Sequence, residues 1–415
     1  MDFTLPEHLP GLLADMDAFI EREIAPLQAE NMQFFDQRRE HARTDWDNDG
    51  IPTREWEDLL SEMRRRADKA GWLRYGLPSS LGGRDGTNVD MAVIREHLAH
   101  KGLGLHNDLQ NESSIVGNFP QVIMMERFGT DAQRAEWSEA LITGARSMAF
   151  GLTEPQHGSD ATWLETHAVQ DGSNEGAWLI NGSKRFNTGV HRATHDLIFA
   201  RTSGEPGQAR GITAFLVPTD AQGFTVPYYW WTFNMPTDHG EVDLNDVRVP
   251  ADAVLGEVDR GLEVAQTFLH ENRIRQAASS LGAAQYCIDR AAEYAGERRV
   301  FGKPLAVNQA VQWPLAELQT EAQMVRLLVQ YAAWHLDRNH HMEVSDKVSM
   351  ANYRANRLVC DAADRAMQIF GGLGYSRHEP FEHIYRHHRR YRITEGAEEI
   401  QIRRVAQRLF KFGQK

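Results

Sequence analysis

The spacing of apolar residues changes twice along the chain, and this change constrains the fold more than any other feature of the sequence. Over residues 1–146 apolar side chains recur every three or four positions, as at Met16 and Phe19, which is typical of helices with one buried face. Residues 147–255 contain short runs with a period of two, such as ITAFLV at 212–217 and FTVPYYWW at 224–231, separated by Gly, Asn, Asp and Pro, which predicts strands. Long helical patterns return over residues 256–415. Because the strands are clustered, a chain of alternating βαβ units is excluded.

We therefore expect an α+β protein with three domains. These are an N-terminal helical domain (1–146), a middle β domain that is barrel-like or a sandwich (147–255), and a C-terminal bundle of long helices (256–415). Two C-terminal segments, residues 262–299 and 308–339, exceed the usual length of a globular helix, which favours the bundle. No GxGxxG sequence lies between a strand and a helix, which disfavours a Rossmann fold.

Composition and charge exclude several classes of protein. The 415 residues include 58 acidic and 45 basic side chains, a net charge of −13, which would repel a phosphate backbone and argues against a nucleic-acid binder. No apolar run reaches the length of a membrane span, and the mean hydropathy is −0.52. The acidic N-terminus lacks the pattern of a targeting signal, and the two cysteines, Cys287 and Cys360, suit a reducing compartment, so we expect a cytoplasmic protein.

Two segments of the β domain have side chains suited to binding a ligand. Residues 150–160, FGLTEPQHGSD, offer hydroxyls and backbone N–H groups that would suit a phosphate or a polar ring edge, although an ordinary turn is the alternative. Residues 181–189, NGSKRFNTG, begin with an Asn-Gly pair that predicts a hairpin. Phe186 and Thr188, two residues apart, are expected on one sheet face, where they could stack on and hydrogen-bond a planar heterocycle. The alternative is a plain surface hairpin.

Three further segments lie in the C-terminal helices. Residues 298–305, RRVFGKPL, form a basic break between helices that could reach a pyrophosphate or could simply be a solvated helix end. In residues 368–375, QIFGGLGY, glycines end a helix and expose its backbone. Glu395 precedes the last helix, where apolar surroundings could make it a general base; a helix-capping carboxylate is the alternative.

Taken together, these segments resemble the acyl-CoA dehydrogenase family. TEPxxGSD, NGxKxFxTG, ERRxFGKPL, QIFGGLGY and a Glu-Gly pair occur in this order within a chain of helices, strands and helices, and the resemblance covers essentially the whole chain. The segment from Arg43 to Asn88 resembles the subgroup that acts on long or branched acyl chains.

The resemblance implies one FAD in the cleft between the β domain and the C-terminal helices. In the β domain, the residues that match cofactor contacts are Phe150, Leu152, Thr153, Gly158, Ser159, Phe186 and Thr188. The residues that match contacts to the FAD of a neighbouring subunit are Arg298, Phe301, Leu305, Gln309, Gln368, Gly371 and Gly372. Ala397 and Glu399 stand at two further cofactor positions, where many members have hydroxyl and amide groups.

The resemblance also implies the reaction. Glu395 matches the base that removes the α-proton of an acyl-CoA thioester while the β-hydride passes to flavin N5. Its backbone N–H, with a flavin ribityl hydroxyl, would polarise the thioester carbonyl. Ser159, Arg273 and Gly396 match substrate positions, Arg273 near a CoA phosphate. The family resemblance further implies a homo-oligomer, commonly a tetramer, a role in fatty acid β-oxidation, and an electron-transfer flavoprotein as partner.

Several alternatives stay open at this point. An oxidase of the same fold is one, and a non-catalytic subunit of a hetero-oligomer is another. A flavin monooxygenase is disfavoured because those relatives typically lack the glutamate base. Histidines gather at 340 and 341 and at 383, 387 and 388, which invites a metal site. The arginine-rich surroundings IYRHHRRYR would repel a cation, so we expect a solvated or interfacial basic face and no metal.

Overall fold

The computed structural model describes residues 4–108, 113–172, 176–339 and 343–411. Its contacts divide the chain into two compact units, which we describe separately. The helical unit contains Met1–Ala42, Arg54–Asn118 and Asn272–Lys415, and the sheet unit contains Arg43–Thr53 and Phe119–Glu271. His340 and His341 lie outside the described residues.

The N-terminal part of the helical unit consists of short amphipathic helices. Their bounds are α1 His8–Phe19, a π-helical turn Ile20–Ile24, α2 Ala25–Ala29, α3 Arg39–Arg43, α4 Arg54–Lys69 and α5 Asn88–His100, with 3₁₀ turns at Met32–Phe34 and Ser79–Leu81. The apolar stripe is buried as its spacing predicts, for example Trp56 and Met63 on α4. Thr87 caps α5 by accepting a hydrogen bond from the backbone N–H of Asp90, which explains where that helix begins.

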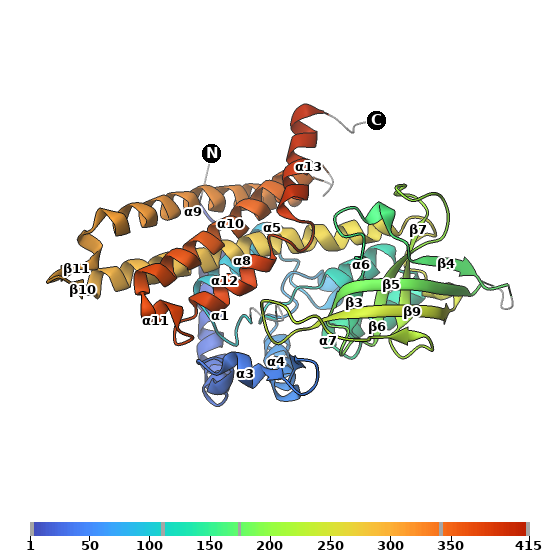
Figure 1. Ribbon diagram of the computed structural model, residues 1–415, viewed down its shortest axis with the longest axis horizontal. Coiled ribbons are helices and arrows are strands. Elements are labelled where there is room, and N and C mark those ends of the chain that lie inside the picture. Colours follow the sequence, from blue (N-terminus) through green and yellow to red (C-terminus); the bar gives the residue numbers. More distant parts are fainter. Residues whose placement is uncertain (1–3, 109–112, 173–175, 340–342, 412–415) are drawn as a thin grey trace. The chain divides into compact units, whose positions relative to one another are not determined.

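Long helices form the C-terminal part of this unit, where α8, α9 and α10 run alongside one another (Figure 1). The bounds are α8 Gly261–Glu297, α9 Gln309–Leu336, α10 Ser345–Phe370, α11 Gly372–Tyr375, α12 Phe381–Arg390 and α13 Glu398–Phe410. Between α8 and α9, β10 Arg299–Val300 and β11 Lys303–Pro304 make a tight hairpin, followed by a 3₁₀ turn at Leu305–Val307. Alanines dominate the core, among them Ala277, Ala284 and Ala355, and their small side chains allow close helix packing.

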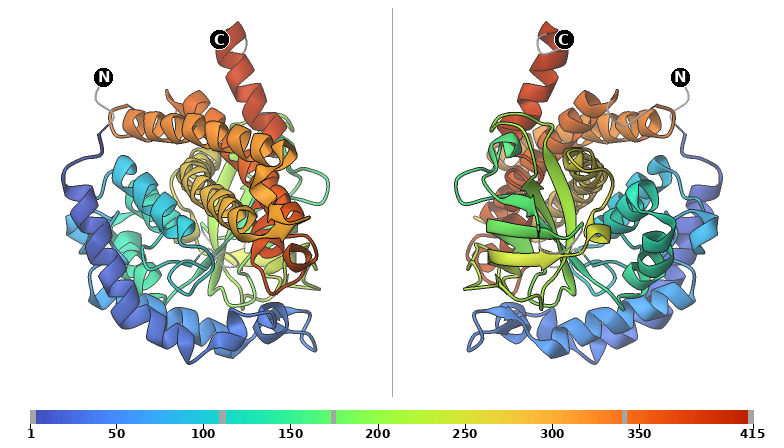
Figure 2. Two further views of the ribbon diagram at one scale, coloured as in Figure 1. Left: turned by 90° about the vertical axis from the view of Figure 1, so that its left-hand side faces the viewer. Right: turned by 90° about the vertical axis from the view of Figure 1, so that its right-hand side faces the viewer.

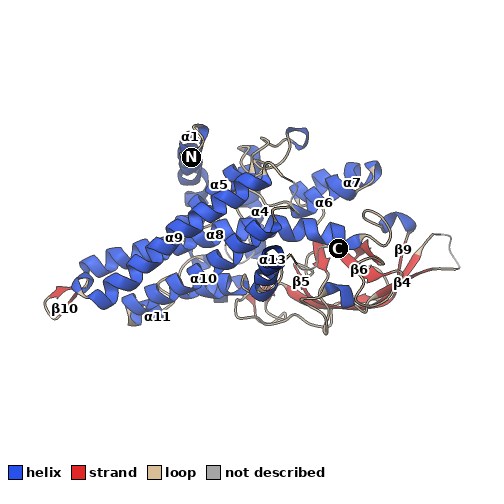
Figure 3. Cartoon of the chain, turned by 90° about the horizontal axis from the view of Figure 1, so that it is seen from above, coloured by secondary structure: helices blue, strands red, loops and turns tan. Residues whose placement is uncertain are grey.

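The sheet unit contains a curled seven-stranded sheet (Figure 2). The strands are β3 Met148–Gly151, β4 His167–Gln170, β5 Trp178–Thr188, β6 His195–Arg201, β7 Ile212–Pro218, β8 Phe224–Thr225 and β9 His239–Val249. Their order is β3-β6-β4-β5-β9-β8, with β7 paired to β6. The unit also contains α6 Pro120–Phe128 and α7 Asp131–Thr143, the β1 Thr44–Asp45 and β2 Ile51–Pro52 hairpin, and 3₁₀ turns at Ala161–Trp163 and Ala251–Ala253 (Figure 3).

The expected order of helices, strands and helices is confirmed, but two local predictions are wrong. Asn181-Gly182 is not a hairpin turn: it lies inside β5 at a register shift against β9. Gly182 has a φ of 146°, and a Cβ there would lie 2.4 Å from Oγ1 of Thr166, so the glycine serves close packing at a bulge. The run FTVPYYWW is a strand only at Phe224–Thr225, because Pro227 has no N–H to donate to a ladder. Among the described residues, no helix is both long and apolar enough to cross a membrane.

Candidate active site

Glu395 lies in a tight turn of the helical unit, between α12 and α13. Glu395 and Gly396 both have positive φ, 51° and 91°. Arg273 of α8 fixes this turn because its Nε and Nη2 donate to the carbonyl oxygen of Glu395 at 2.9 and 2.6 Å. A Cβ at position 396 would lie 2.8 Å from Nη2 of Arg273, so the guanidinium can sit here only against glycine. Burial lowers the pKa of Arg273 to about 10.

The carboxylate of Glu395 has one direct side-chain partner. Gln276, one turn of α8 beyond Arg273, donates from Nε2 to Oε2 of Glu395 at 2.7 Å. The capping alternative for Glu395 is wrong, because the N-cap of α13 is Ala397. Among the described residues, none accepts a hydrogen bond from the backbone N–H of Glu395. The turn therefore presents a carboxylate and a backbone donor side by side.

The start of α13 is anchored by a neighbouring acid. Glu398 accepts paired hydrogen bonds from Arg392 at 2.9 and 2.9 Å and from Arg357 at 3.1 and 3.2 Å. The hydrogen bonds from Arg392, followed by those from Arg357, lower the pKa of Glu398 to about 2 despite partial burial. Ala397 and Glu399 are the two further cofactor positions predicted from the sequence. Ala397 is the N-cap residue of α13 and makes no capping hydrogen bond with its side chain, and Glu399 is exposed in the first turn of that helix.

In the sheet unit the structure brings the two β-domain motifs together. The backbone N–H of Arg185 donates to the carbonyl of Thr153 at 2.8 Å, and Lys184 donates to Glu154 at 2.7 Å. Glu154 also accepts the backbone N–H of Thr166 at 2.9 Å. Burial opposes ionisation of Glu154, but the charge of Lys184 and these donors outweigh it and lower its pKa. Sequence reasoning missed this ion pair, although both partners lie in the motifs.

The aromatic and hydroxyl expected on one sheet face are both exposed. Phe186 has a φ of 61° at a register shift of β5, and its ring lies 5.4 Å from that of Trp230. Thr188 bonds Nδ1 of His239 at 2.9 Å. In the adjoining loop Leu152 and Thr153 are partly buried, whereas Gly158 and Ser159 are exposed. Phe150 stacks on Phe268 with 4.1 Å between ring centroids, so its ring is committed to internal packing.

A second group of predicted residues gathers at one end of the helical unit, where α11 and the β10–β11 hairpin lie near each other (Figures 1 and 3). Tyr294 stacks on Phe370 with ring centroids 4.1 Å apart, which joins the ends of α8 and α10. The predicted residues exposed at this end are Arg298, Phe301, Gln309, Gln368, Gly371 and Gly372, while Leu305 is partly buried. Beyond Arg273, α8 continues for 24 residues, a rise of about 36 Å. These residues therefore do not meet Glu395 within one chain.

Three family models together match most of the chain. The chain matches the acyl-CoA dehydrogenase N-terminal domain over residues 21–145, the middle domain over 149–247 and the C-terminal domain over 259–410. It belongs to the acyl-CoA dehydrogenase family. The family and the α+β fold class predicted from the sequence are thus confirmed.

Individual relatives are similar over most of their length. The 3-(aryl)acrylate reductase of Clostridium sporogenes is 32% identical over 85% of this chain and 91% of its own. The caffeyl-CoA reductase-Etf complex subunit CarC of Acetobacterium woodii is 31% identical over 85% of this chain and 91% of its own. A solved structure described as a putative acyl-CoA dehydrogenase from Mycobacterium abscessus has a TM-score of 0.85 and 27% identity, covering 99% of this chain and 100% of that one.

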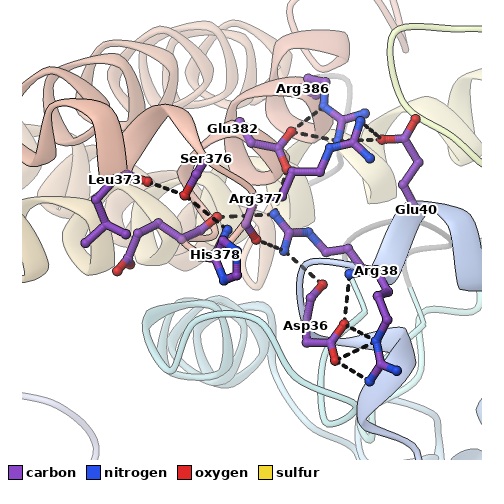
Figure 4. Close-up of polar contacts among 11 residues, drawn as sticks. Asp36, Arg38, Glu40, Leu373, Ser376, Arg377, His378, Glu382 and Arg386 are labelled. Atoms are coloured by element: carbon purple, nitrogen blue, oxygen red, sulfur yellow. Dashed lines mark hydrogen bonds and ion pairs between the residues drawn. The ribbon is translucent and has the colours of Figure 1, made fainter.

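In this member of the acyl-CoA dehydrogenase family, the segment after Gly371 and Gly372 is held by ion pairs (Figure 4). Arg377 pairs with Glu40 at 2.6 Å, and Arg386 pairs with Glu382 at 2.7 Å. The buried Arg39 donates to the backbone carbonyl of Arg377 at 2.7 Å and to Glu382 at 2.6 Å. Residues near the N-terminus thus fix the segment that follows the glycine turn.

The histidine interpretation needs correction. His383, His387 and His388 are buried, not solvated, because the face of α12 that carries them packs inside the helical unit. His387 bonds the hydroxyl of Tyr391 at 2.9 Å, and His388 bonds the hydroxyl of Ser280 at 3.0 Å. Burial holds the pKa of His387 well below its ordinary value. No cluster of metal-ligating side chains occurs within the described ranges.

Proposed function

We propose that this chain is an FAD-dependent acyl-CoA dehydrogenase in which Glu395 is the catalytic base. The observation that carries the proposal is the turn at Glu395: its backbone is fixed by Arg273, its Oε2 accepts a hydrogen bond from Gln276, and its own N–H has no acceptor in the described chain. One residue thus offers both a carboxylate base and a backbone N–H donor, and this combination suits the removal of a proton next to a carbonyl group.

Each group at this turn has a distinct task. The carboxylate of Glu395 takes the α-proton of the acyl thioester, and the N–H of Glu395 donates to the thioester carbonyl, where negative charge develops. Bound FAD would supply the acceptor for the hydride that leaves the β-carbon. Arg273 holds the turn through the carbonyl of Glu395, so it acts on the acyl group indirectly. The family resemblance implies a direct contact of Arg273 with a CoA phosphate, and this contact is a second proposal.

The described residues fit the flavin. An exposed aromatic ring at Phe186 and an exposed hydroxyl at Thr188 can face a planar heterocycle, and the loop at Gly158 and Ser159 leaves its backbone accessible to polar groups of the cofactor. Phe150 would contribute through its backbone, since its ring stacks on Phe268. The remaining proposed contacts in the sheet unit are Leu152 and Thr153.

The separation along α8 supports assembly into a homo-oligomer. Arg298 lies just past the end of α8, about 36 Å of helix beyond Arg273. Gln368 lies on α10, about 24 Å of helix beyond Asn352, which bonds the carbonyl of Arg273. One subunit would therefore complete the site of another. On α9 an exposed apolar face runs at helical spacing and offers a surface for this contact: Trp313, Met324, Leu327, Tyr331 and Trp334. A dimer or a tetramer fits these observations.

An electron-transfer flavoprotein is the proposed partner. The name of the relative CarC includes an Etf complex, which supports this partner over oxygen as the electron acceptor. Some relatives are named reductases, and a carboxyl that serves as base in one direction serves as acid in the other, so the same site can act on the unsaturated thioester. The proposal also includes a role in fatty acid oxidation, a preference for long or branched acyl chains and a cytoplasmic location. The proposed domain limits are 1–146, 147–255 and 256–415.

The decisive test is Glu395→Gln. The amide keeps the shape of the side chain but cannot take the α-proton, so the rate of flavin reduction by a competent acyl-CoA should fall by at least about 10²–10⁴. FAD content and melting temperature should stay near those of the wild type, because Glu395 caps no helix. Reduction at an unchanged rate would mean that the base lies elsewhere.

The substrate can be identified by titrating the purified yellow protein with a panel of acyl-CoA thioesters. Bleaching of the flavin spectrum identifies a thioester that the enzyme oxidises. Chemically reduced enzyme mixed with the matching enoyl-CoA reveals the reverse reaction by recovery of the colour. A colourless protein that takes up no added FAD would refute the cofactor assignment.

A further inference from the structure

Gln276, the residue that bonds Glu395, is the first member of a buried chain of three amides. Its Oε1 accepts a hydrogen bond from Nδ2 of Asn352 on α10 at 3.3 Å. Oδ1 of Asn352 in turn accepts Nε2 of Gln401 on α13 at 2.8 Å. All three side chains are almost completely buried. We call Gln276, Asn352 and Gln401 the amide chain.

Backbone carbonyls fix which end of each amide is the donor. Nδ2 of Asn352 lies 2.8 Å from the carbonyl oxygen of Arg273, and Nε2 of Gln401 lies 3.1 Å from that of Gly396. A carbonyl oxygen can only accept, so these amide nitrogens cannot exchange places with their oxygens without losing a buried hydrogen bond. The orientation of Asn352 then requires Oε1 of Gln276 to face it, which leaves Nε2 of Gln276 facing Glu395.

The two oxygens of Glu395 are consequently not equivalent. Oε2 receives the N–H of Gln276 at 2.7 Å, while no described residue donates a hydrogen bond to Oε1. A carboxylate oxygen that already accepts a directed hydrogen bond is the poorer proton acceptor of the two. The amide chain is also tied to the backbone of the same turn, through the carbonyls of Gly396 and Arg273.

We propose that Gln276 is a positioning residue for the base: the amide chain holds its N–H on Oε2 of Glu395, so that Oε1 is presented as the oxygen that takes the α-proton. This inference rests on the proposed function and adds to it a preferred atom and the residues that select it. Gln276 touches Glu395 and is given no contact with the substrate. Asn352 and Gln401 act only through Gln276.

The charges around this turn come from α8, α10, α13 and the residues between α12 and α13. Arg273 on α8 lies against the carbonyl of Glu395 and interacts electrostatically with both Glu395 and Arg404 of α13. At the start of α13, Glu398 is engaged by Arg392 and Arg357. The amide chain itself is neutral, so replacing one of its members by an acid introduces a charge whose effect can be followed as the pH is changed.

Two substitutions at position 276 separate positioning from simple packing. Gln276→Met keeps the length of the side chain but removes the donor, and flavin reduction should slow by about 10- to 100-fold, as a misplaced reacting group does, with the half-saturating acyl-CoA concentration little changed. Gln276→Glu restores a donor only while the two facing carboxyls share one proton. Its reduction rate should therefore rise and then fall with increasing pH, whereas Gln276→Met should show no falling limb.

Stopped-flow reduction of the FAD-loaded variants across pH 5 to 9 measures both effects. Cys287→Ala is the matched control: Cys287 lies about three turns further along α8, is equally buried, and makes no hydrogen bond to the amide chain. It should lower the melting temperature without changing the rate. Gln401→Met should slow reduction in the same direction as Gln276→Met, by a smaller factor.

The outcomes are distinguishable. Wild-type rates in Gln276→Met would overturn the inference, and so would a Gln276→Glu variant that is equally slow at every pH, since that result indicates packing alone. If Gln276→Met fails to retain FAD, the pH profile of Gln276→Glu decides. A fully active Glu395→Gln variant would instead refute the proposed base, which is a separate failure.

Discussion

Asp196 on β6 places a carboxyl group in the interior of the sheet unit. The side chain is completely buried and accepts a hydrogen bond from Nδ2 of Asn187, while Lys184 lies near enough to act on it electrostatically. Burial is the largest effect and raises the pKa of Asp196 to about 7. Near neutral pH the folded protein therefore holds a proton that an unfolded chain would release, since an aspartate in an unfolded chain has a pKa of about 4.

Asp196 should make the protein less stable as the pH rises. Between about pH 4 and pH 7 the folded state binds more protons than the unfolded state, so the free energy of unfolding falls with pH over this range and levels off above it. Asp196→Asn removes the titrating group and should flatten this dependence. Urea unfolding at pH 5 and pH 8 measures it, with the exposed Asp58→Asn as control. Equal pH dependence in wild type and Asp196→Asn would contradict the prediction.

At the scale of residues, short motifs suggested candidate site residues but not the side chains that support them. Glu395, Phe186 and Thr188 were proposed because each lies in a short motif. Gln276 carries no such signal, because its partner Glu395 is 119 positions away and only the fold brings them together. The pairing of Lys184 with Glu154 was missed for the same reason, although a lysine at a buried strand position implies an acidic partner nearby.

At the scale of elements, α8 and α5 pack at a glycine. A Cβ at Gly282 of α8 would lie 2.1 Å from the backbone carbonyl oxygen of Glu96 on α5, whereas a Cβ at Gly296 of the same helix would meet nothing within 4 Å. Gly282→Ala should therefore push the helices apart and destabilise the fold by about 1–3 kcal/mol. Gly296→Ala should stabilise it by roughly 0.5–1 kcal/mol, because alanine favours the helix. Thermal unfolding followed by circular dichroism gives the melting temperatures of both variants. Changes of the same sign in the two melting temperatures would refute the packing argument.

The ion pairs around the glycine turn give a second element-scale prediction. Arg39 is buried and donates to three backbone carbonyls and to Glu382, whereas the side chain of the adjacent Arg38 is exposed and pairs with Asp36. Arg39→Met removes the donor to Oε1 of Glu382 and to the backbone carbonyls, although Arg386 still pairs with Oε2, and should cost roughly 3 kcal/mol. Arg38→Met should change stability by less than about 0.5 kcal/mol. Similar melting temperatures for the two variants would mean that this segment is not held through Arg39.

Elements with strong periodicity were predictable, and elements defined by long-range contacts were not. The helices expected at 262–299 and 308–339 occur as Gly261–Glu297 and Gln309–Leu336, because long amphipathic patterns are unambiguous. The Asn-Gly pair at 181–182 carries a strong local turn signal, but pairing of β5 with both β4 and β9 overrides it. The histidines of α12 suggested a polar surface because the sequence does not show that α8, which supplies the partner Ser280, packs against them.

At the scale of the whole molecule, cofactor retention should depend on assembly. Arg298 is proposed to reach the FAD of a neighbouring subunit, and removing a charge-assisted contact of roughly 1.5–3 kcal/mol should weaken FAD binding by about 10- to 100-fold in Arg298→Ala. Arg299→Ala is the matched control, since Arg299 lies in the same hairpin but matches no cofactor position. Equilibrium titration of the apoprotein with FAD gives the comparison. Equal dissociation constants for both variants would refute the cross-subunit contact.

The length of α8 has a practical consequence for anyone who handles this enzyme. If each binding site draws on residues from both ends of this helix in different subunits, loading with flavin is a second-order process that obeys mass action in protein as well as in cofactor. Turnover per subunit would then fall when stock solutions are diluted far below the dissociation constant of the assembly. Assays at very low enzyme concentration would then underestimate the turnover of the assembled enzyme. The time course of the loss of activity after dilution would give the rate at which the subunits dissociate.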